Sequence, residues 1–90
     1  MSRISESEIA DVIIDILEDV ATRQSSIADL ISAIPGRIAL CADDLAPSPS
    51  RPGEHVWEQQ VRNVTSHKNS PGNAVHDGRL VAIPGGLSLP

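Results

Sequence analysis

The sequence predicts a small α+β domain in which three helices are followed by an antiparallel β-hairpin. Three segments repeat apolar residues at the spacing of a helix face, and glycines and prolines separate them. The end of the chain reads as two short strands around a Pro-Gly-Gly turn. Ninety residues correspond to one domain, residues 1–90, with a small core. Because Phe and Tyr are missing, aliphatic side chains around the single Trp57 must form that core.

The first helix has the most regular pattern in the chain. Ser5 and Glu8 form a capping box at its start, and Ile4 with Ile9 fits a hydrophobic staple. Its apolar face follows the i, i+3, i+4, i+7 rule and comprises Ile9, Val12, Ile13, Ile16, Leu17 and Val20.

A second helix is expected from Ser26 to Ile34, with Ser25 or Ser26 as its cap and Pro35-Gly36 as its end. The segment from Thr22 to Ser25 is then a short loop. Such a loop makes the two helices neighbours in space, so residues 1–35 form a helical pair.

Residues 36–53 form a Pro-rich loop. The apolar run 38–41 could be a short strand, and Asp43-Asp44-Leu45 is typical of a turn or a short helical start. Pro47, Pro49 and Pro52 lack amide donors and fix φ, so they predict an extended, semi-rigid segment. A structural loop leading into the third helix is favoured over an interaction motif.

The third helix, expected over residues 54–68, places Trp57, Val61 and Val64 on one apolar stripe. Asn73 to His76 is compatible with one further helical turn. The hairpin over 79–89 consists of a strand from Arg79 to Ile83, a turn, and a strand from Leu87 to Leu89. This order of elements is typical of a winged helix-turn-helix with a small antiparallel hairpin as its wing, although other small α+β domains share it.

Charge is unevenly distributed along the chain, which carries a net −5. Residues 1–50 hold three arginines against nine acids, whereas residues 51–90 hold four cations against three acids. Nucleic-acid-binding proteins usually carry a basic face, so DNA binding by this chain should be weak and salt-sensitive. The acids Asp11, Asp15, Glu18 and Asp19 on the first helix form either a solvated face or a surface for a protein partner or a second copy.

No pattern in the chain indicates catalysis, a cofactor or a metal. His55, His67 and His76 are 12 and 9 residues apart, which is too far for typical zinc pairs. The same region contains the letters of an HNH nuclease, His67, Asn73 and His76, without the hairpin and spacing of that motif. Cys41 has apolar neighbours and no evident base. We therefore expect a non-enzymatic protein.

The expected compartment is the cytoplasm. One cysteine forms no internal disulfide, the first residues are too polar for a secretory leader, and no apolar run is long enough to span a membrane.

The polar side of the third helix is the candidate site. Asn and Gln can bond adenine edges in the major groove, Arg can bond guanine, and basic residues nearby can contact phosphates. Exposed helix faces are commonly polar, so this pattern alone is weak. The candidate DNA-binding residues are Arg51, His55, Gln59, Arg62, Asn63, Ser66, Lys68 and Arg79.

Three stretches resemble a known family. The sequence Trp57 to Asn63, then Gly72-Asn73, then His76 to Leu80, is similar to the winged-helix N-terminal domain of Mrr-type bacterial restriction proteins. Residues 43–45 and 50–53 fit the loop before the third helix of such domains. The resemblance covers residues 43–90 best and is only topological over 1–42. It implies a DNA-binding accessory module without nuclease activity, with the third helix as recognition element.

Two functions are therefore expected. The first is a non-catalytic module that binds double-stranded DNA in a restriction-type or regulatory system. The alternative is an acidic interaction or dimerisation module of the same fold, without direct DNA binding.

Overall fold

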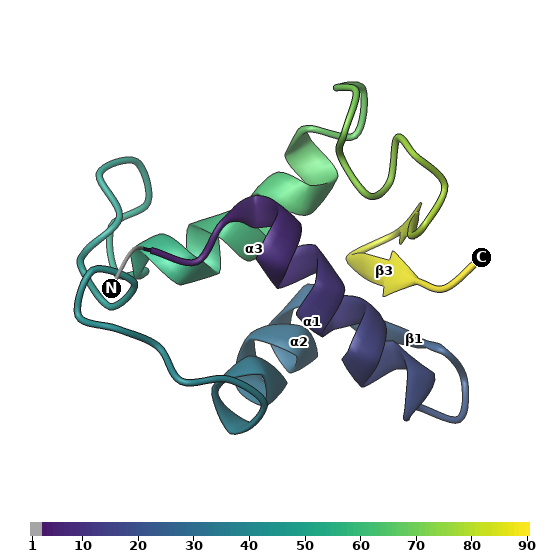
Figure 1. Ribbon diagram of the computed structural model, residues 1–90, viewed down its shortest axis with the longest axis horizontal. Coiled ribbons are helices and arrows are strands. Elements are labelled where there is room, and N and C mark those ends of the chain that lie inside the picture. The colour runs from purple at the N-terminus through teal and green to yellow at the C-terminus, as the bar shows by residue number, and fades with distance from the viewer. Residues whose placement is uncertain (1–2) are drawn as a thin grey trace.

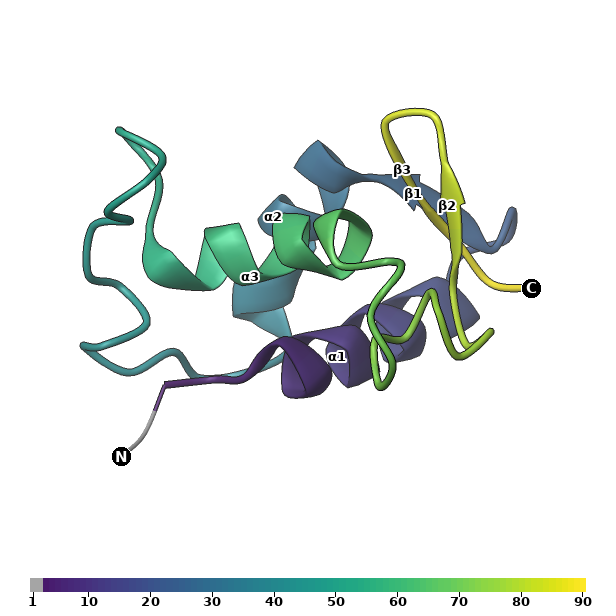
Figure 2. The same ribbon diagram turned by 90° about the horizontal axis from the view of Figure 1, so that it is seen from above.

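A computed structural model of the chain describes residues 3–90 and contains three α-helices and a three-stranded antiparallel sheet (Figure 1). Its elements, in chain order, are α1 (Glu6–Glu18), β1 (Gln24–Ser26), α2 (Ile27–Ala33), the 3-10 helix η1 (Ile34–Gly36), α3 (Val56–Ser66), β2 (Val81–Ile83) and β3 (Gly86–Ser88). Residues 1 and 2 lie outside the described residues. They belong to the predicted helical pair, 1–35, and to the polar start of the chain. The sheet lies at one end of the molecule, and the loop between η1 and α3 lies at the opposite end (Figure 2).

The first helix confirms its predicted cap. The Ser5 hydroxyl accepts a hydrogen bond from the Glu8 amide at 3.1 Å, and the Glu8 carboxylate accepts one from the Ser5 amide at 3.0 Å. These two bonds satisfy donors that the first turn of a helix would otherwise leave unpaired. The helix therefore begins at Glu6, where the sequence pattern places its start.

The second helix is also confirmed, and it is capped by Ser26, whose hydroxyl accepts from the Asp29 amide at 3.1 Å. Pro35 does not end the helical segment abruptly. Instead, the residues from Ile34 to Gly36 form one 3-10 turn. Such a turn tolerates a proline near its start, because no amide donor is needed there.

The sheet corrects the prediction for residues 22–25. This segment, expected as a plain loop, contributes β1, which pairs with β3 through Gln24↔Ser88, Ser25↔Leu87 and Ser26↔Gly86. The other edge of β3 pairs with β2, as the predicted hairpin requires. The strands are displaced from their predicted bounds: β2 begins at Val81 instead of Arg79, and β3 spans Gly86–Ser88 instead of Leu87–Leu89. The strand order is β1-β3-β2, so the sheet joins the connection between α1 and α2 to the end of the chain.

Three other segments also differ from the sequence prediction. Residues 38–41 form no strand, and their backbone does not pair with any other strand of the described chain. Residues 73–76 form turns rather than a helix, with the Asn73 carboxamide accepting from the amides of Val75 and His76. The third helix spans Val56–Ser66 instead of 54–68, because His55 is its N-cap and His67 its C-cap.

The core lies between the three helices and the sheet. As predicted, it contains Trp57 and aliphatic side chains, with Val61 and Val64 fully buried beside it. The remaining fully buried large side chains come from all parts of the chain and are Ile9, Ile13, Leu17, Leu30, Ile34, Leu80 and Leu87. This packing fixes the rotation of α3, and therefore determines which of its polar side chains remain accessible.

Candidate nucleic-acid interface

The loop before α3 is bound to the first turn of that helix. The Val56 and Trp57 amides donate to the carbonyl oxygens of Ala46 and Asp44, at 2.9 and 3.1 Å. The amide of Ser48 donates to the Glu54 carbonyl at 2.8 Å. Because these bonds use the orphan amides at the helix start, the Pro-rich segment is a structural loop with a defined path, as the sequence favoured.

Gln59 is engaged by that loop. The Ser48 hydroxyl donates to the Gln59 amide oxygen at 2.6 Å, and the Gln59 amide nitrogen donates to the Ser50 hydroxyl at 2.9 Å. Ser48 itself is buried. Asn63 lies on the same side of α3 and donates to Gln60 at 3.3 Å, beside a hollow that Arg3 and Pro49 also line. Both predicted base-reading amides therefore have partners within the chain.

Glu54 brings two of the predicted arginines together. Its carboxylate accepts from Arg62 through Nε at 2.9 Å and Nη2 at 2.6 Å, and from Arg51 Nε at 2.8 Å. The Arg62 side-chain hydrogen bond, aided by Arg51, holds the pKa of the Glu54 carboxyl below its ordinary value. The same bond raises the pKa of Arg62. Glu54 and Arg62 are therefore both charged at neutral pH.

Arg62, Arg51 and Ser66 face the hairpin. A hollow of about 270 Å³ lies between the C-terminal half of α3, the start of α2 and the turn between β2 and β3. Its lining consists of Ile27, Arg51, Arg62, Thr65, Ser66, Ile83, Gly85 and Gly86. The Thr65 hydroxyl is buried and makes no hydrogen bond within the described part of the chain. This hollow is the place where the structure combines polar α3 side chains, positive charge and the hairpin.

The other predicted residues lie elsewhere. His55 is paired with Glu58 at 2.8 Å, at the first turn of α3. Lys68 is exposed just after the helix ends. Arg79 contacts α1, where its guanidinium donates to Asp11 at 2.9 Å. The structure thus brings together Arg51, Arg62 and Ser66, but not Arg79.

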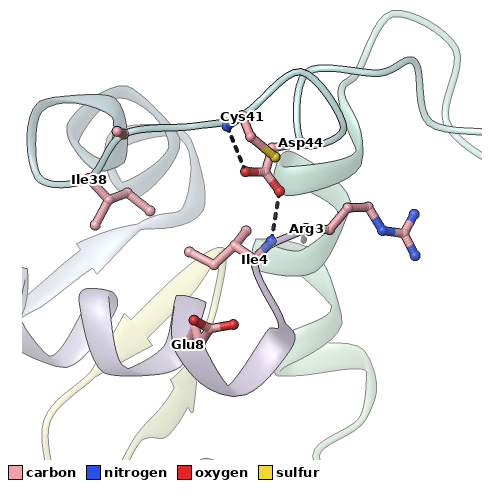
Figure 3. Close-up of a pocket in the computed structure, with 7 residues that line it drawn as sticks. Arg3, Ile4, Glu8, Ile38, Cys41 and Asp44 are labelled. Atoms are coloured by element: carbon pink, nitrogen blue, oxygen red, sulfur yellow. Dashed lines mark hydrogen bonds between the residues drawn. The ribbon is translucent and has the colours of Figure 1, made fainter. Parts of the chain in front are cut away.

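A second hollow, of about 320 Å³, lies at the opposite end of the molecule, beside the start of α1 (Figure 3). The Asp44 carboxylate lies between two backbone segments and accepts from the amides of Ile4 at 2.7 Å and Cys41 at 3.0 Å. Burial raises the pKa of Asp44, but these hydrogen bonds outweigh burial, and the pKa lies below its ordinary value. Arg3 points away from Asp44 in this view. The carboxylate ties the N-terminal segment to the 41–45 turn.

The three histidines lie in separate pairs. His67 contacts Glu6 at 2.6 Å and His76 contacts Asp77 at 3.1 Å, while His55 is held by Glu58. Across residues 3–90, no group of three or more His, Cys, Asp or Glu side chains is arranged to hold a metal ion. Over the same residues, no helix combines the length and apolar character that crossing a membrane requires.

Three residues important to this region were missed by sequence reasoning. From the sequence, no role at this site is assigned to Glu54, Ser48 or Thr65. The acid at the helix start, flanked by arginines three residues before and eight after, is a signal that could have located the Arg51–Glu54–Arg62 cluster.

No protein family model, curated protein or solved structure matches this chain.

Proposed function

We propose that the chain is a non-catalytic winged-helix module that binds double-stranded DNA, as an accessory or regulatory part of a bacterial restriction-type system. The order α1-β1-α2-α3-β2-β3, with β1 pairing to the outer side of the hairpin, supports a winged helix. In that arrangement α3 is the recognition helix and the β2–β3 hairpin is the wing. The restriction context comes from the sequence resemblance to Mrr-type proteins.

The hollow between α3 and the hairpin is the observation that carries this proposal. Arg62 and Ser66 lie one helical turn apart on the side of α3 that faces the hairpin, and Arg51 extends the same surface. An α-helix with its side chains is about 10–12 Å in diameter. It fits a major groove that is about 12 Å wide. Arg62 is then placed to reach a base edge or a phosphate, and Arg51 to reach the adjacent backbone.

The charge distribution sets the expected strength of binding. Arg37, Arg51, Arg62 and Arg79 are each paired with a carboxylate of the chain itself. Each of these arginines must exchange a carboxylate for a phosphate before it contributes to DNA binding. We therefore expect micromolar rather than nanomolar affinity and a strong loss of binding with added salt.

Fluorescence anisotropy with a labelled random duplex at about 50 mM KCl tests the proposal. Arg62→Ala should weaken binding several-fold. Arg37→Ala is the matched control, because Arg37 is also an acid-paired arginine but its partners, Asp15 and Asp19, lie on α1 and at its C-cap. No binding of the wild-type chain at tens of micromolar protein, or equal effects of the two substitutions, would overturn it.

A second candidate function is supported by α1. Asp11, Asp15 and Asp19 keep about two thirds of their side-chain surface exposed, although they pair with Arg79 or Arg37. An exposed row of acidic side chains suits a protein partner or a second copy of the chain. Light scattering after size exclusion should then show a dimer, or a pull-down should recover a partner that Asp15→Lys releases. A monomer that recovers no partner rules this candidate out.

We also propose the cytoplasm as the compartment, because the chain has a single cysteine and therefore forms no internal disulfide.

A further inference from the structure

The Arg51–Glu54–Arg62 cluster has the geometry of an anion site that is already filled by the protein itself. Arg62 presents Nε and Nη2 to one carboxylate oxygen of Glu54, at 2.9 and 2.6 Å, and its Nε also lies 3.1 Å from the other oxygen. Arg51 donates to that second oxygen at 2.8 Å. A planar guanidinium binds phosphate oxygens through the same pair of donors.

Exposure within the cluster is asymmetric. The Glu54 side chain is 16% exposed, whereas those of Arg62 and Arg51 are 35% and 50% exposed. Both arginines line the hollow beside the hairpin, while Glu54 lies outside it and lines a neighbouring hollow with Ser50 and Pro52. An incoming anion can therefore approach the two guanidinium groups from the hairpin side without first removing the loop.

Glu54 lies in the loop that enters α3, outside the helix itself. An exposed Gly53 with φ of +85° precedes it. Its backbone is held through Ser48, whose amide donates to the Glu54 carbonyl. Rotation of the Glu54 side chain would thus release both arginines while leaving the loop bound to α3.

We propose that the Glu54 carboxylate occupies the place of a DNA backbone phosphate between Arg51 and Arg62. It thereby lowers the affinity of the chain for duplex DNA, because a phosphate must displace it before both arginines can bind DNA. This inference rests on the proposed function. It assigns the two arginines to one phosphate site and makes Glu54 an intramolecular competitor. At neutral pH the competitor is fully ionised, because the Arg62 hydrogen bond keeps the pKa of Glu54 low.

Anisotropy titrations of the wild-type chain, Glu54→Gln and Glu58→Gln against the same duplex test the inference. Glu58→Gln is the matched control. It removes the same charge four residues along the chain, from a side chain that is 17% exposed and paired with His55. Glu58 acts on Arg62 through its charge alone, whereas Glu54 also accepts hydrogen bonds from Arg62. We expect Glu54→Gln to bind at least roughly tenfold tighter, since it removes a carboxylate that would face the phosphate. Glu58→Gln should stay within about twofold of wild type, as screening of a more distant charge predicts.

Salt dependence distinguishes a new phosphate contact from a general charge effect. The slope of log K against log salt should steepen by about 0.9 for Glu54→Gln, the value of one phosphate contact. Adding Arg62→Ala to Glu54→Gln should abolish the gain. Equal affinity and slope for the two Gln variants, with measurable wild-type binding, would overturn the competitor role while leaving DNA binding intact. No binding by any variant would instead overturn the proposed function.

A second measurement covers the case in which Glu54→Gln fails to fold. In the wild-type chain, the Arg62 Nε–H resonance should shift during a titration with duplex DNA, as its acceptor changes from carboxylate to phosphate. The Arg37 Nε–H resonance serves as an internal control and should not move. A stationary Arg62 resonance in a complex that forms would overturn the inference.

Discussion

The Asp44 carboxylate accepts a hydrogen bond from the Ile4 amide at 2.7 Å, across forty residues of sequence (Figure 3). Its second oxygen accepts from the Cys41 amide at 3.0 Å, and the Asp44 carbonyl accepts from the Trp57 amide. One buried residue therefore joins the start of α1, the 41–45 turn and the start of α3. This arrangement positions the loop that carries Ser48, Arg51 and Glu54.

Asp44→Asn should destabilise the fold by about 1–3 kcal/mol at pH 7, because an amide offers one acceptor oxygen and directs an NH₂ group at the second backbone donor. Urea melts followed by circular dichroism measure this loss. Asp43→Asn is the control, since Asp43 is exposed and next in sequence. Equal stability of the two variants would mean that the Asp44 hydrogen bonds contribute nothing in solution.

Stability should fall in acid. The pKa values of Glu54 and Asp44 in the folded chain lie below their ordinary values of 4.5 and 3.8. A carboxyl with a lowered pKa contributes stability above its unfolded pKa and loses it as pH falls through the folded pKa. The free energy of unfolding should thus decline below about pH 4.5, more shallowly in Glu54→Gln combined with Asp44→Asn. An identical acid dependence in that variant would contradict the assignment.

Gly86 is required by the packing of β3 against β1. A Cβ at this position would lie 2.1 Å from the Ser25 carbonyl oxygen and 2.9 Å from the Ser26 Cα, both of which are backbone atoms. Gly86→Ala must therefore push the strands apart and should cost about 3 kcal/mol in urea melts. Gly36→Ala has no neighbouring atom within 4 Å and should change stability by less than about 1 kcal/mol. A neutral Gly86→Ala would show that the β1–β3 pairing is not formed in solution.

This pairing also shows where sequence reasoning reaches its limit. The three helices could be predicted because their apolar periodicity and caps are local signals. The strand β1 could not, because Gln24-Ser25-Ser26 has no alternation of its own and its partner, β3, lies some sixty residues away in the sequence. The polar face of α3 was likewise visible as a pattern. Its internal partners, Ser48 for Gln59 and Glu54 for Arg62, depend on the path of an irregular loop, which no periodicity encodes.

Trp57 was predicted to lie in the core, and its 4% exposed fraction confirms this. Trp57→Ala should cost about 3–5 kcal/mol, a large part of the stability of so small a domain. Its indole nitrogen has no acceptor among residues 3–90, so Trp57→Phe removes no hydrogen bond and should cost less than about 1.5 kcal/mol. Urea melts of the two variants measure both values. A loss below 1 kcal/mol for Trp57→Ala would be incompatible with a buried ring.

Asn73 is buried and connects the loop after α3 to both neighbouring helices. Its amide nitrogen donates to the Val64 carbonyl at 2.9 Å and to the Glu6 carboxylate at 3.0 Å. Asn73→Asp keeps the shape and the acceptor oxygen but loses both donors, and it places a second carboxylate against Glu6. We expect a loss of about 1–3 kcal/mol, whereas Asn69→Asp at an exposed position should be close to neutral.

A double-mutant cycle separates the two causes of that loss. Glu6→Gln in the N73D background removes the repulsion and supplies an amide donor in its place, so it should restore about 0.5–1 kcal/mol. The Val64 carbonyl remains unpaired, so recovery should be incomplete. If Glu6→Gln destabilises the wild-type and N73D backgrounds equally, the two side chains are not coupled. The contact between the start of α1 and the loop after α3 would then contribute nothing to stability.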